Sequence, residues 1–336
     1  GGNWSPRSGD VATQHRVEIG GERIEYRATA GTLPLTSGSR DTLARIFYVS
    51  YERTNDSDGS QRPVMFSFNG GPGSSSAWMH LGLLGPWRVN ALEARENGSP
   101  PPYELVDNHQ SLLDVTDLVF VDPVATGYSR AAPGVDRGRF LGYREDLAAV
   151  AEFIRRWITE NGRWGSPKFL IGESYGSRRA AGLAQVLQVR EGMDLNGVVL
   201  VSAGSIGRDY ADAGLLRHAL YLPHFAATAW YHDRLGSELG DQPLPDVLDE
   251  VESYALDSYA RALIRGNRLS EAERARVAER LARYTGLSAS FIERSDLRVE
   301  RPEFRRELLR GDRRSVGRLD SRFLGIEEDG TARVPS

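Results

Sequence analysis

The sequence predicts an α/β fold, in which a doubly wound, mostly parallel sheet carries an inserted helical cap. Up to residue 202, short apolar runs typical of buried strands alternate with segments of helical periodicity. From about Arg208 to Asp320, helical periodicity and heavy charge continue without a strong strand pattern. We therefore expect a core over residues 1–207 and a helical cap or lid over residues 208–336.

The predicted core begins with an antiparallel entry and continues as a parallel sheet. Entry strands rich in β-branched and aromatic residues are expected at 17–19, 24–28 and 43–51. Further strands are expected at 63–68, 117–121, 168–172 and 197–202. A helix is expected at 143–160, because its apolar residues recur at helical spacing. Strands that alternate with helices pair in parallel, since a parallel connection needs a long crossover.

The predicted cap contains one helix with clear start and stop signals. Ser270 is followed three residues later by Glu273, which is the pattern of a capping box at a helix N-terminus. Gly286 is expected to end that helix, because glycine adopts the left-handed conformation that closes helices. Charged helical runs such as 274–283 are typical of solvated faces, so we assign them no binding role.

Composition narrows the classes of function. A chain of 336 residues that is 40% hydrophobic can bury a substantial core. The net charge of −4 offers no basic surface for nucleic acid or an anionic membrane, and the apolar runs are only strand-length. With no cysteine, disulfides, thiolate metal sites and a cysteine nucleophile are excluded. We expect no cofactor, no metal, no nucleic acid and no membrane partner.

The most informative segment is the pentapeptide Gly172–Gly176, which reads G-E-S-Y-G. An apolar run, 168–171, precedes it and a helical pattern, 177–187, follows it. A G-x-S-x-G between a strand and a helix is typical of a sharp turn that presents the serine hydroxyl above the sheet. Glycine is expected on both sides because a Cβ there would collide with the neighbouring strand and helix. Ser174 is therefore our candidate nucleophile.

A second segment supplies what a serine nucleophile needs. The strand at 63–68 runs into residues 69–73, which read N-G-G-P-G. Acyl transfer forms an oxyanion that backbone N–H groups must stabilise. One donor normally belongs to the residue after the nucleophile, here Tyr175, and the other to a glycine-rich loop after an earlier strand. The alternative is a simple turn before a helix capped by Ser74 or Ser75, but the downstream elbow favours the oxyanion loop.

Together these motifs resemble the paired signatures of the serine carboxypeptidase family. Residues 120–129, F-V-D-P-V-A-T-G-Y-S, resemble its third motif, and the three blocks occur in the family's order and spacing over about residues 40–205. Ser74 and Leu83 stand where well-known eukaryotic members carry a cysteine and a glutamate, so the chain is more similar to bacterial members. The resemblance implies an α/β-hydrolase fold and hydrolysis of the C-terminal peptide bond of peptides.

The resemblance also implies roles for individual residues. Ser174 would be the nucleophile, and the N–H groups of Gly71 and Tyr175 would form the oxyanion hole. Asn69 and Glu173 would hold the terminal carboxylate of the peptide substrate. Glu173 can donate a hydrogen bond to a carboxylate only when it is protonated, which agrees with activity at acidic pH.

The triad is incomplete by sequence. In this fold an aspartate and then a histidine follow the nucleophile, each after a late strand of the sheet. The histidines after Ser174 are His218, His224 and His232, and no strand pattern with a trailing aspartate precedes them. We expect the triad Asp and His to come from sequence beyond residue 336, on a second chain or a C-terminal segment of the same precursor. The C-terminal part of the fold would then be absent from residues 1–336.

Two other functions stay open at this point. The same elbow and oxyanion loop could pass the acyl group to an alcohol, which would make the protein an acyltransferase. The fold could also serve as a non-catalytic scaffold. The chain opens with Gly1 rather than methionine, which indicates a trimmed N-terminus and a secreted or periplasmic protein, with the cytoplasm as the alternative.

Overall fold

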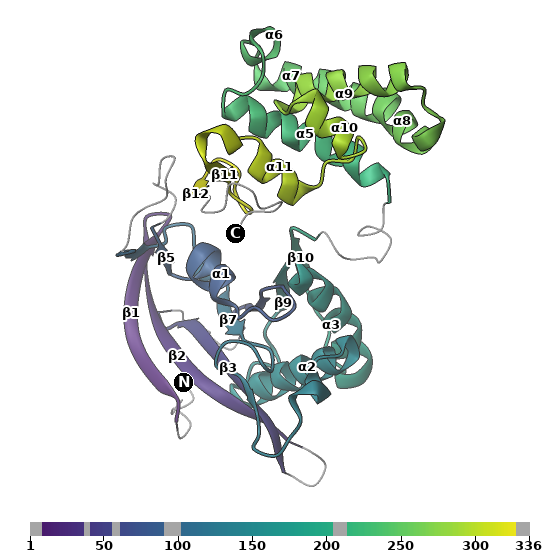
Figure 1. The fold of residues 1–336 in the computed structure, drawn as a ribbon. Helices are drawn as coiled ribbons and strands as arrows, with labels where there is room; N and C mark the ends of the chain where they lie inside the picture. The colour runs from purple at the N-terminus through teal and green to yellow at the C-terminus, as the bar shows by residue number, and fades with distance from the viewer. Residues whose placement is uncertain (1–8, 37–40, 56–60, 91–101, 204–213, 327–336) are drawn as a thin grey trace. The chain divides into compact units, whose positions relative to one another are not determined.

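The computed structural model describes residues 9–36, 41–55, 61–90, 102–203 and 214–326. It divides into two compact units, the first formed by 1–90 and 104–211 and the second by 91–103 and 212–336. We call them the sheet unit and the helical unit (Figure 1). The sequence placed this division at residues 207 and 208, which lie outside the described ranges.

The sheet unit is built on an eight-stranded sheet with the order β1-β2-β3-β7-β4-β9-β10, and β8 pairs with β3. The strands are β1 (Val11–Ile19), β2 (Glu22–Thr36), β3 (Thr42–Arg53), β4 (Val64–Phe68), β7 (Asp117–Val121), β8 (Arg130–Ala131), β9 (Lys168–Glu173) and β10 (Gly197–Val201). Strands β1 to β3 are antiparallel, whereas β7, β4, β9 and β10 run parallel to one another. This arrangement confirms the predicted α/β-hydrolase fold, with each predicted strand in place.

Two helices cover one face of this sheet. Helix α2 (Tyr143–Glu160) has the predicted bounds, and α3 (Tyr175–Glu191) begins directly after the elbow. The two helices lie side by side (Figure 1), with α3 against β9, β10 and β4 and with α2 against α3 and β2. Trp157 is fully buried and meets Phe66 edge to face, with 5.5 Å between ring centroids. This apolar layer fixes the carboxyl ends of the parallel strands, where the candidate site lies.

The opposite face of the sheet has a smaller core of its own. It contains Met79, Leu113 and Phe120 together with residues of β1 and β2. The short elements around it are α1 (Ala77–Met79), the π-helical turn η1 (His80–Leu84), the 3-10 turn η2 (Leu112–Asp114), and the paired strands β5 (Trp87–Val89) and β6 (Leu105–Asp107). A further 3-10 turn, η3 (Arg137–Phe140), belongs to the first core and contacts α2. Helix α1 and η1 directly follow the glycine-rich loop, and their residues Met79 and Leu84 anchor the end of that loop in this second core.

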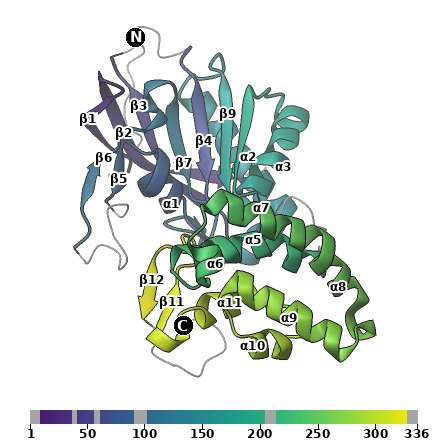
Figure 2. The same cartoon turned by 90° about the horizontal axis from the view of Figure 1, so that it is seen from above.

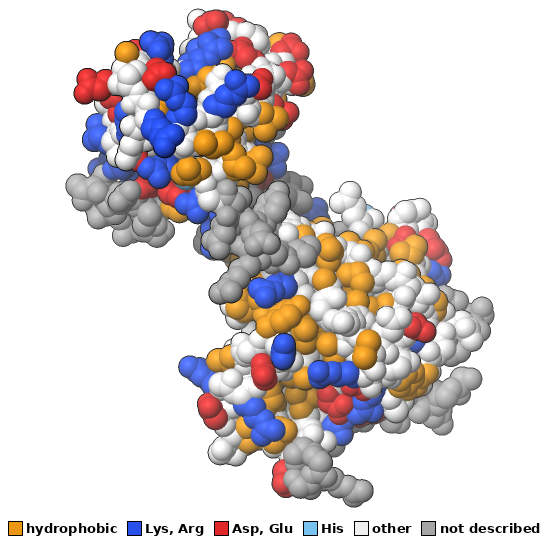
Figure 3. All heavy atoms as spheres, turned by 90° about the vertical axis from the view of Figure 1, so that its right-hand side faces the viewer, with side chains coloured by type: hydrophobic (Ala, Val, Ile, Leu, Met, Phe, Trp, Pro, Cys, Tyr) orange, Lys and Arg blue, Asp and Glu red, His pale blue; other side chains and the backbone are white. Residues whose placement is uncertain are grey.

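The helical unit has a separate apolar core (Figure 2). Its helices are α5 (Leu216–Tyr231), α6 (Ser237–Gly240), α7 (Leu244–Tyr254), η4 (Ala255–Tyr259), α8 (Ala260–Arg265), η5 (Gly266–Arg268), α9 (Glu271–Thr285), α10 (Ala289–Arg294), α11 (Arg301–Glu307) and η6 (Arg310–Asp312). The capping box of Ser270 and Glu273 is confirmed, and Gly286 ends α9 with φ of +69°. Arginine and carboxylate side chains are interspersed on the surface of this unit (Figure 3).

One expectation for the helical unit is wrong in detail. The sequence showed no strong strand between Arg208 and Asp320, but β11 (Arg314–Val316) pairs with β12 (Leu324–Ile326) in a small antiparallel sheet. Three residues are too few to establish an alternating pattern, so the sequence carried no readable signal for this pair.

Candidate active site

The predicted elbow is present at Ser174. This residue lies between the end of β9 and the start of α3, with φ of +55° and ψ of −119°. A positive φ is sparsely populated for a residue with a side chain, so surrounding contacts must hold it. The Ser174 N–H donates to the Val201 carbonyl at 2.9 Å, and the Ser177 N–H donates to the Ser174 carbonyl at 3.0 Å. The serine is thus fixed from both the neighbouring strand and the helix.

The two glycines of the motif are required by close backbone contacts. A Cβ on Gly172 would lie 2.0 Å from the carbonyl oxygen of Gly176. A Cβ on Gly176 would lie 2.5 Å from the carbonyl oxygen of Phe68 and 2.9 Å from that of Asn69. All three distances are far below van der Waals contact, so the elbow can close on itself and pack onto the end of β4 only with glycine at these positions.

The glycine-rich loop packs directly on the elbow. A Cβ on Gly70 would lie 2.7 Å from the backbone nitrogen of Tyr175 and 2.8 Å from the Ser174 Cβ. Gly71 and Gly73 have φ of +110° and +114°, a conformation that favours glycine. The loop that carries one predicted oxyanion donor is therefore in contact with the residue that carries the other.

The two side chains assigned to the substrate carboxylate form a pair beside Ser174. Asn69 Nδ2 donates to Glu173 Oε2 at 3.2 Å. Asn69 is 1% exposed, and its Oδ1 accepts from the Met79 N–H at 2.9 Å, so the orientation of the amide is fixed. Among the described residues no hydrogen bond reaches Glu173 Oε1. The structure thus brings together all five predicted site residues.

The third motif braces the oxyanion loop. Asp122 Oδ1 accepts from the Ser76 N–H at 2.8 Å, and its Oδ2 accepts from the Tyr128 N–H at 3.3 Å. A Cβ on Gly127 would lie 1.7 Å from Asp122 Oδ2, which explains the glycine. Burial raises the pKa of Asp122, while the hydrogen bonds from Ser76 and Tyr128 oppose that shift. The motif therefore ties the start of α1 to β7 rather than supplying chemistry.

Sequence reasoning missed an ion pair that reaches the same loop. Arg179, on α3, donates from Nε to Asp146 Oδ2 at 2.8 Å and from Nη1 to the Asn69 carbonyl at 3.0 Å. Burial raises the pKa of Asp146, and the Arg179 guanidinium counteracts it. One sequence signal could have revealed this ion pair. Arg179, Leu183 and Leu187 recur every four residues, so the arginine shares a helix face with two leucines and needs a buried partner.

No hydrogen bond joins a histidine to Ser174 within the described part of the chain, which includes all six histidines. The side chains of five have other partners: His15 with Thr13, His80 with Tyr51, His109 with the Glu18 carbonyl, His218 with the Val299 carbonyl and His232 with the Ser321 carbonyl. His224 lies in the helical unit and lines a pocket there. A catalytic base is therefore not identified among these residues.

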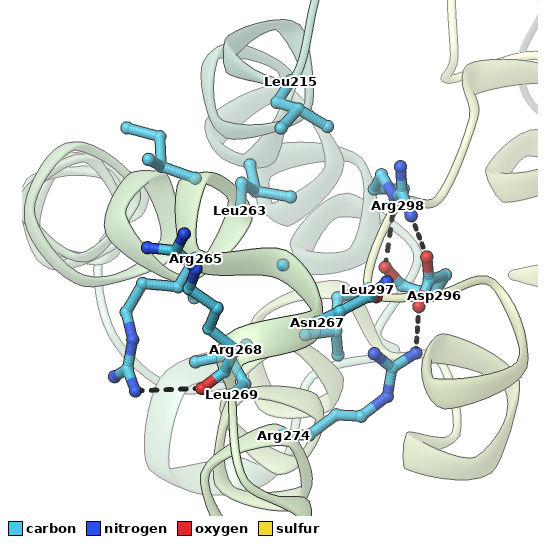
Figure 4. A pocket seen from close by; sticks show the side chains of 13 residues that line it. Leu215, Leu263, Arg265, Asn267, Arg268, Leu269, Arg274, Asp296, Leu297 and Arg298 are labelled. Atoms are coloured by element: carbon cyan, nitrogen blue, oxygen red, sulfur yellow. Dashed lines mark hydrogen bonds and ion pairs between the residues drawn. The ribbon is translucent and has the colours of Figure 1, made fainter.

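The helical unit has a pocket of about 390 Å³, whose lining includes four arginines and one aspartate (Figure 4). Arg274 and Arg298 both pair with Asp296, and Arg265 pairs with Glu273. Three of the four arginines are therefore already paired with carboxylates, and we assign this pocket no ligand. In the described ranges there is also no metal-binding cluster of His, Cys, Asp or Glu, and no helix is long and apolar enough to cross a membrane.

Comparison with known proteins adds to this geometry. The family model described as serine carboxypeptidase matches residues 25–219, more than half of the 336 residues. Serine carboxypeptidase-like 35 of Arabidopsis thaliana is 29% identical over 170 residues, which are 50% of this chain and 32% of that protein. Carboxypeptidase Y homolog A of Paracoccidioides lutzii is 27% identical over 220 residues, 63% of this chain and 36% of that protein. The chain spans about a third of the length of these curated relatives.

A solved structure is also similar. KEX1(delta)p, a prohormone-processing carboxypeptidase from Saccharomyces cerevisiae, is 22% identical with a TM-score of 0.48, and the match covers 78% of this chain and 53% of that chain. Since the family model matches more than half of the sequence, the chain belongs to the serine carboxypeptidase family.

Proposed function

We propose that the protein is a serine-type carboxypeptidase that hydrolyses the C-terminal peptide bond of peptides through an acyl-enzyme on Ser174. The observation that carries this proposal is the contact between the elbow and the glycine-rich loop. Gly70 lies against Ser174 and Tyr175 so closely that no side chain fits between them. A serine held at positive φ beside such a loop has the geometry that acyl transfer requires.

In the proposed reaction, Ser174 Oγ attacks the carbonyl carbon of the last peptide bond while its proton passes to the general base, which then becomes the general acid. The carbonyl oxygen becomes an oxyanion that accepts hydrogen bonds from the N–H groups of Gly71 and Tyr175. The C–N bond then breaks, and the C-terminal amino acid leaves with a proton delivered by the general acid. Water attacks the resulting ester, which releases the shortened peptide and restores the Ser174 hydroxyl.

The Asn69 and Glu173 pair would select a free C-terminal carboxylate. Asn69 Nδ2 already donates to Glu173 Oε2, which leaves Oε1 for the contact with the substrate. A protonated carboxyl is a donor to carboxylate, whereas an ionised one repels it. This explains why the pair suits a carboxypeptidase better than an endopeptidase, whose substrate has no charge at that position.

For the missing base we propose a C-terminal segment of the same precursor that carries the triad Asp and His. Strand β10 supports this proposal, because it ends the sheet order and no other described strand pairs with its outer edge. Val198, Val199 and Leu200 are 37%, 42% and 41% exposed. Hydrophobic side chains are also visible on the sheet unit in Figure 3. An open apolar edge is a template for a further strand. Mass spectrometry under denaturing conditions should detect that segment in active protein, as a second polypeptide or as part of a longer chain.

The deciding assay compares N-blocked dipeptides with a free or an amidated C-terminus, with and without acceptor alcohols. A carboxypeptidase hydrolyses the free acid and fails on the amide. Ester formation in place of hydrolysis would identify an acyltransferase, and turnover of both peptides alike would reject the carboxylate-binding role of Glu173. We also propose a secreted or periplasmic location, which cell fractionation would test.

A further inference from the structure

We propose that Arg179 is a positioning residue that holds the glycine-rich loop in place beside the elbow through the Asn69 carbonyl. This inference rests on the proposed function, in which the N–H of Gly71 is one of the two donors. Arg179 is 2% exposed and donates from Nη1 to that carbonyl at 3.0 Å. It touches neither Ser174 nor the predicted carboxylate-binding side chains through a hydrogen bond in the described structure.

The effect of Arg179 on the loop follows from the planarity of the peptide bonds in it. Within one peptide unit the C=O and N–H groups point in opposite directions. Arg179 fixes the unit that joins Asn69 to Gly70 by holding its carbonyl. The next unit is fixed because the Gly70 carbonyl accepts from the Ser74 N–H at 3.2 Å, so the Gly71 N–H points away from Ser74. Ser74 thus holds the peptide unit that carries the donor, and Arg179, on α3, holds the unit directly before it.

Arginine suits this position because three of its contacts need a planar, forked group. Nε reaches Asp146 on α2 while Nη1 reaches the loop. The face of the guanidinium lies over the Tyr175 ring, with 5.2 Å from Cζ to the ring centroid. A lysine ammonium could reach either the carboxylate or the carbonyl, but it has no second arm and no flat face. The side chain therefore connects α2, the elbow helix and the oxyanion loop.

The sheet unit offers a matched control in Arg163. This arginine is also buried, donates from Nη1 to Asp117 Oδ2 at 2.7 Å, and donates from Nη2 to the Arg62 carbonyl at 2.7 Å. It differs in place, because Asp117 begins β7 and therefore lies at the end of the sheet opposite Ser174. The two arginines make the same kinds of contact, but only one of them reaches the oxyanion loop.

The experiment compares Arg179→Lys with Arg163→Lys in the active protein, which contains this chain and the proposed C-terminal segment. For a blocked dipeptide we expect Arg179→Lys to lower kcat roughly tenfold to a hundredfold with KM within about twofold, because a misplaced donor affects the transition state more than substrate binding. Arg163→Lys should lower stability toward urea and leave kcat unchanged. Amide hydrogen exchange at Ser74, whose N–H is held by the loop, should accelerate in Arg179→Lys only.

Equal kcat values for the two variants would overturn the proposal, as would a change in KM alone or unchanged exchange at Ser74. The exchange measurement needs no substrate. If the wild-type protein hydrolysed no peptide, the proposed function would fail, while faster exchange at Ser74 would still support the positioning role of Arg179. If peptides were hydrolysed but both variants behaved alike, only the positioning role would fail.

Discussion

The two ends of the parallel strands in the sheet unit differ in what they hold. At the carboxyl end, the residues with side chains and positive φ in the described part of this unit are Ala125, Ser174 and Ser202, which follow β7, β9 and β10. At the amino end, Asp117 binds the side chains of Arg62 and Arg163, with Oδ1 2.9 Å from Arg62 Nε.

The strained backbone conformations and the stabilising ion pairs thus lie at opposite ends of the parallel strands. Unusual backbone conformations collect at the carboxyl end, which is where open α/β sheets bind ligands, and they persist only because neighbouring contacts fix them. The amino end uses regular strand starts and buried ion pairs. We therefore expect changes at one end to affect activity and changes at the other end to affect stability.

The largest expected effect is that of Ser174→Ala. Loss of a triad nucleophile typically lowers kcat on the order of a million-fold. The fold should stay intact, because the Ser174 contacts that hold the elbow are made by its backbone. Steady-state hydrolysis of a blocked dipeptide and circular dichroism measure the two quantities. If a pure preparation of Ser174→Ala were as active as the wild type, Ser174 would not be the nucleophile.

The second prediction concerns the contact between loop and elbow. A Cβ on Gly70 meets backbone atoms of Glu173 and Tyr175 at 2.8 and 2.7 Å, so Gly70→Ala must push the two segments apart. We expect kcat to fall by about a hundredfold or more, because small displacements of reacting groups have large effects. Gly165→Ala is the control, since its Cβ would meet only Gln61 Nε2 at 3.9 Å. Similar kcat values for both variants would contradict the account.

At the opposite end, Asp117→Ala should act on stability alone. It leaves two buried arginines without their carboxylate, and breaking such a pair typically costs about 3–5 kcal/mol. Urea unfolding measures this loss, and kcat per folded molecule should match the wild-type value. A fall in kcat without a fall in stability would show that the two ends are not separate.

The smallest expected effect is a pH dependence of stability through His80, in the turn η1 that follows the glycine-rich loop. Its Nε2 lies 2.6 Å from the Tyr51 hydroxyl oxygen, its ring stacks on Phe120, and burial lowers its pKa to about 4. Between the ordinary pKa near 6.5 and about 4, the unfolded chain binds a proton that the folded protein does not, so stability falls as the pH falls. The loss is roughly 3 kcal/mol below that window.

His80→Gln removes this titration. The difference in free energy of unfolding between wild type and variant should therefore change between pH 7 and pH 4, with the wild type losing more. A difference that stays constant across this range would show that His80 does not sense acid.

Local signals made the fold and most of the site predictable. The elbow at Ser174 follows from a strand, five residues and a helix in direct succession. Strand β2 was underestimated because it contains Gly31 and Pro34, which usually interrupt strands. Gly31 is accommodated for a reason that sequence does not show, since a Cβ there would lie 2.1 Å from Asp10 Oδ1.

The contacts that remained unpredicted join distant parts of the chain. Arg179 and the Asn69 carbonyl are 110 positions apart, and Asp122 and the Ser76 N–H are 46 apart. Contacts between such distant positions produce no repeating pattern in the sequence. Only the charge on the apolar face of α3 indicated that Arg179 has a partner.

The most direct test of the central claim is to trap the acyl-enzyme. Active protein is mixed with a blocked dipeptide ester, quenched in acid within the first turnover, digested, and analysed by mass spectrometry. We predict that the acyl group is found on Ser174, within the peptide that contains Glu173 and Tyr175. An acyl group on any other residue, or full turnover with no covalent intermediate, would contradict the account.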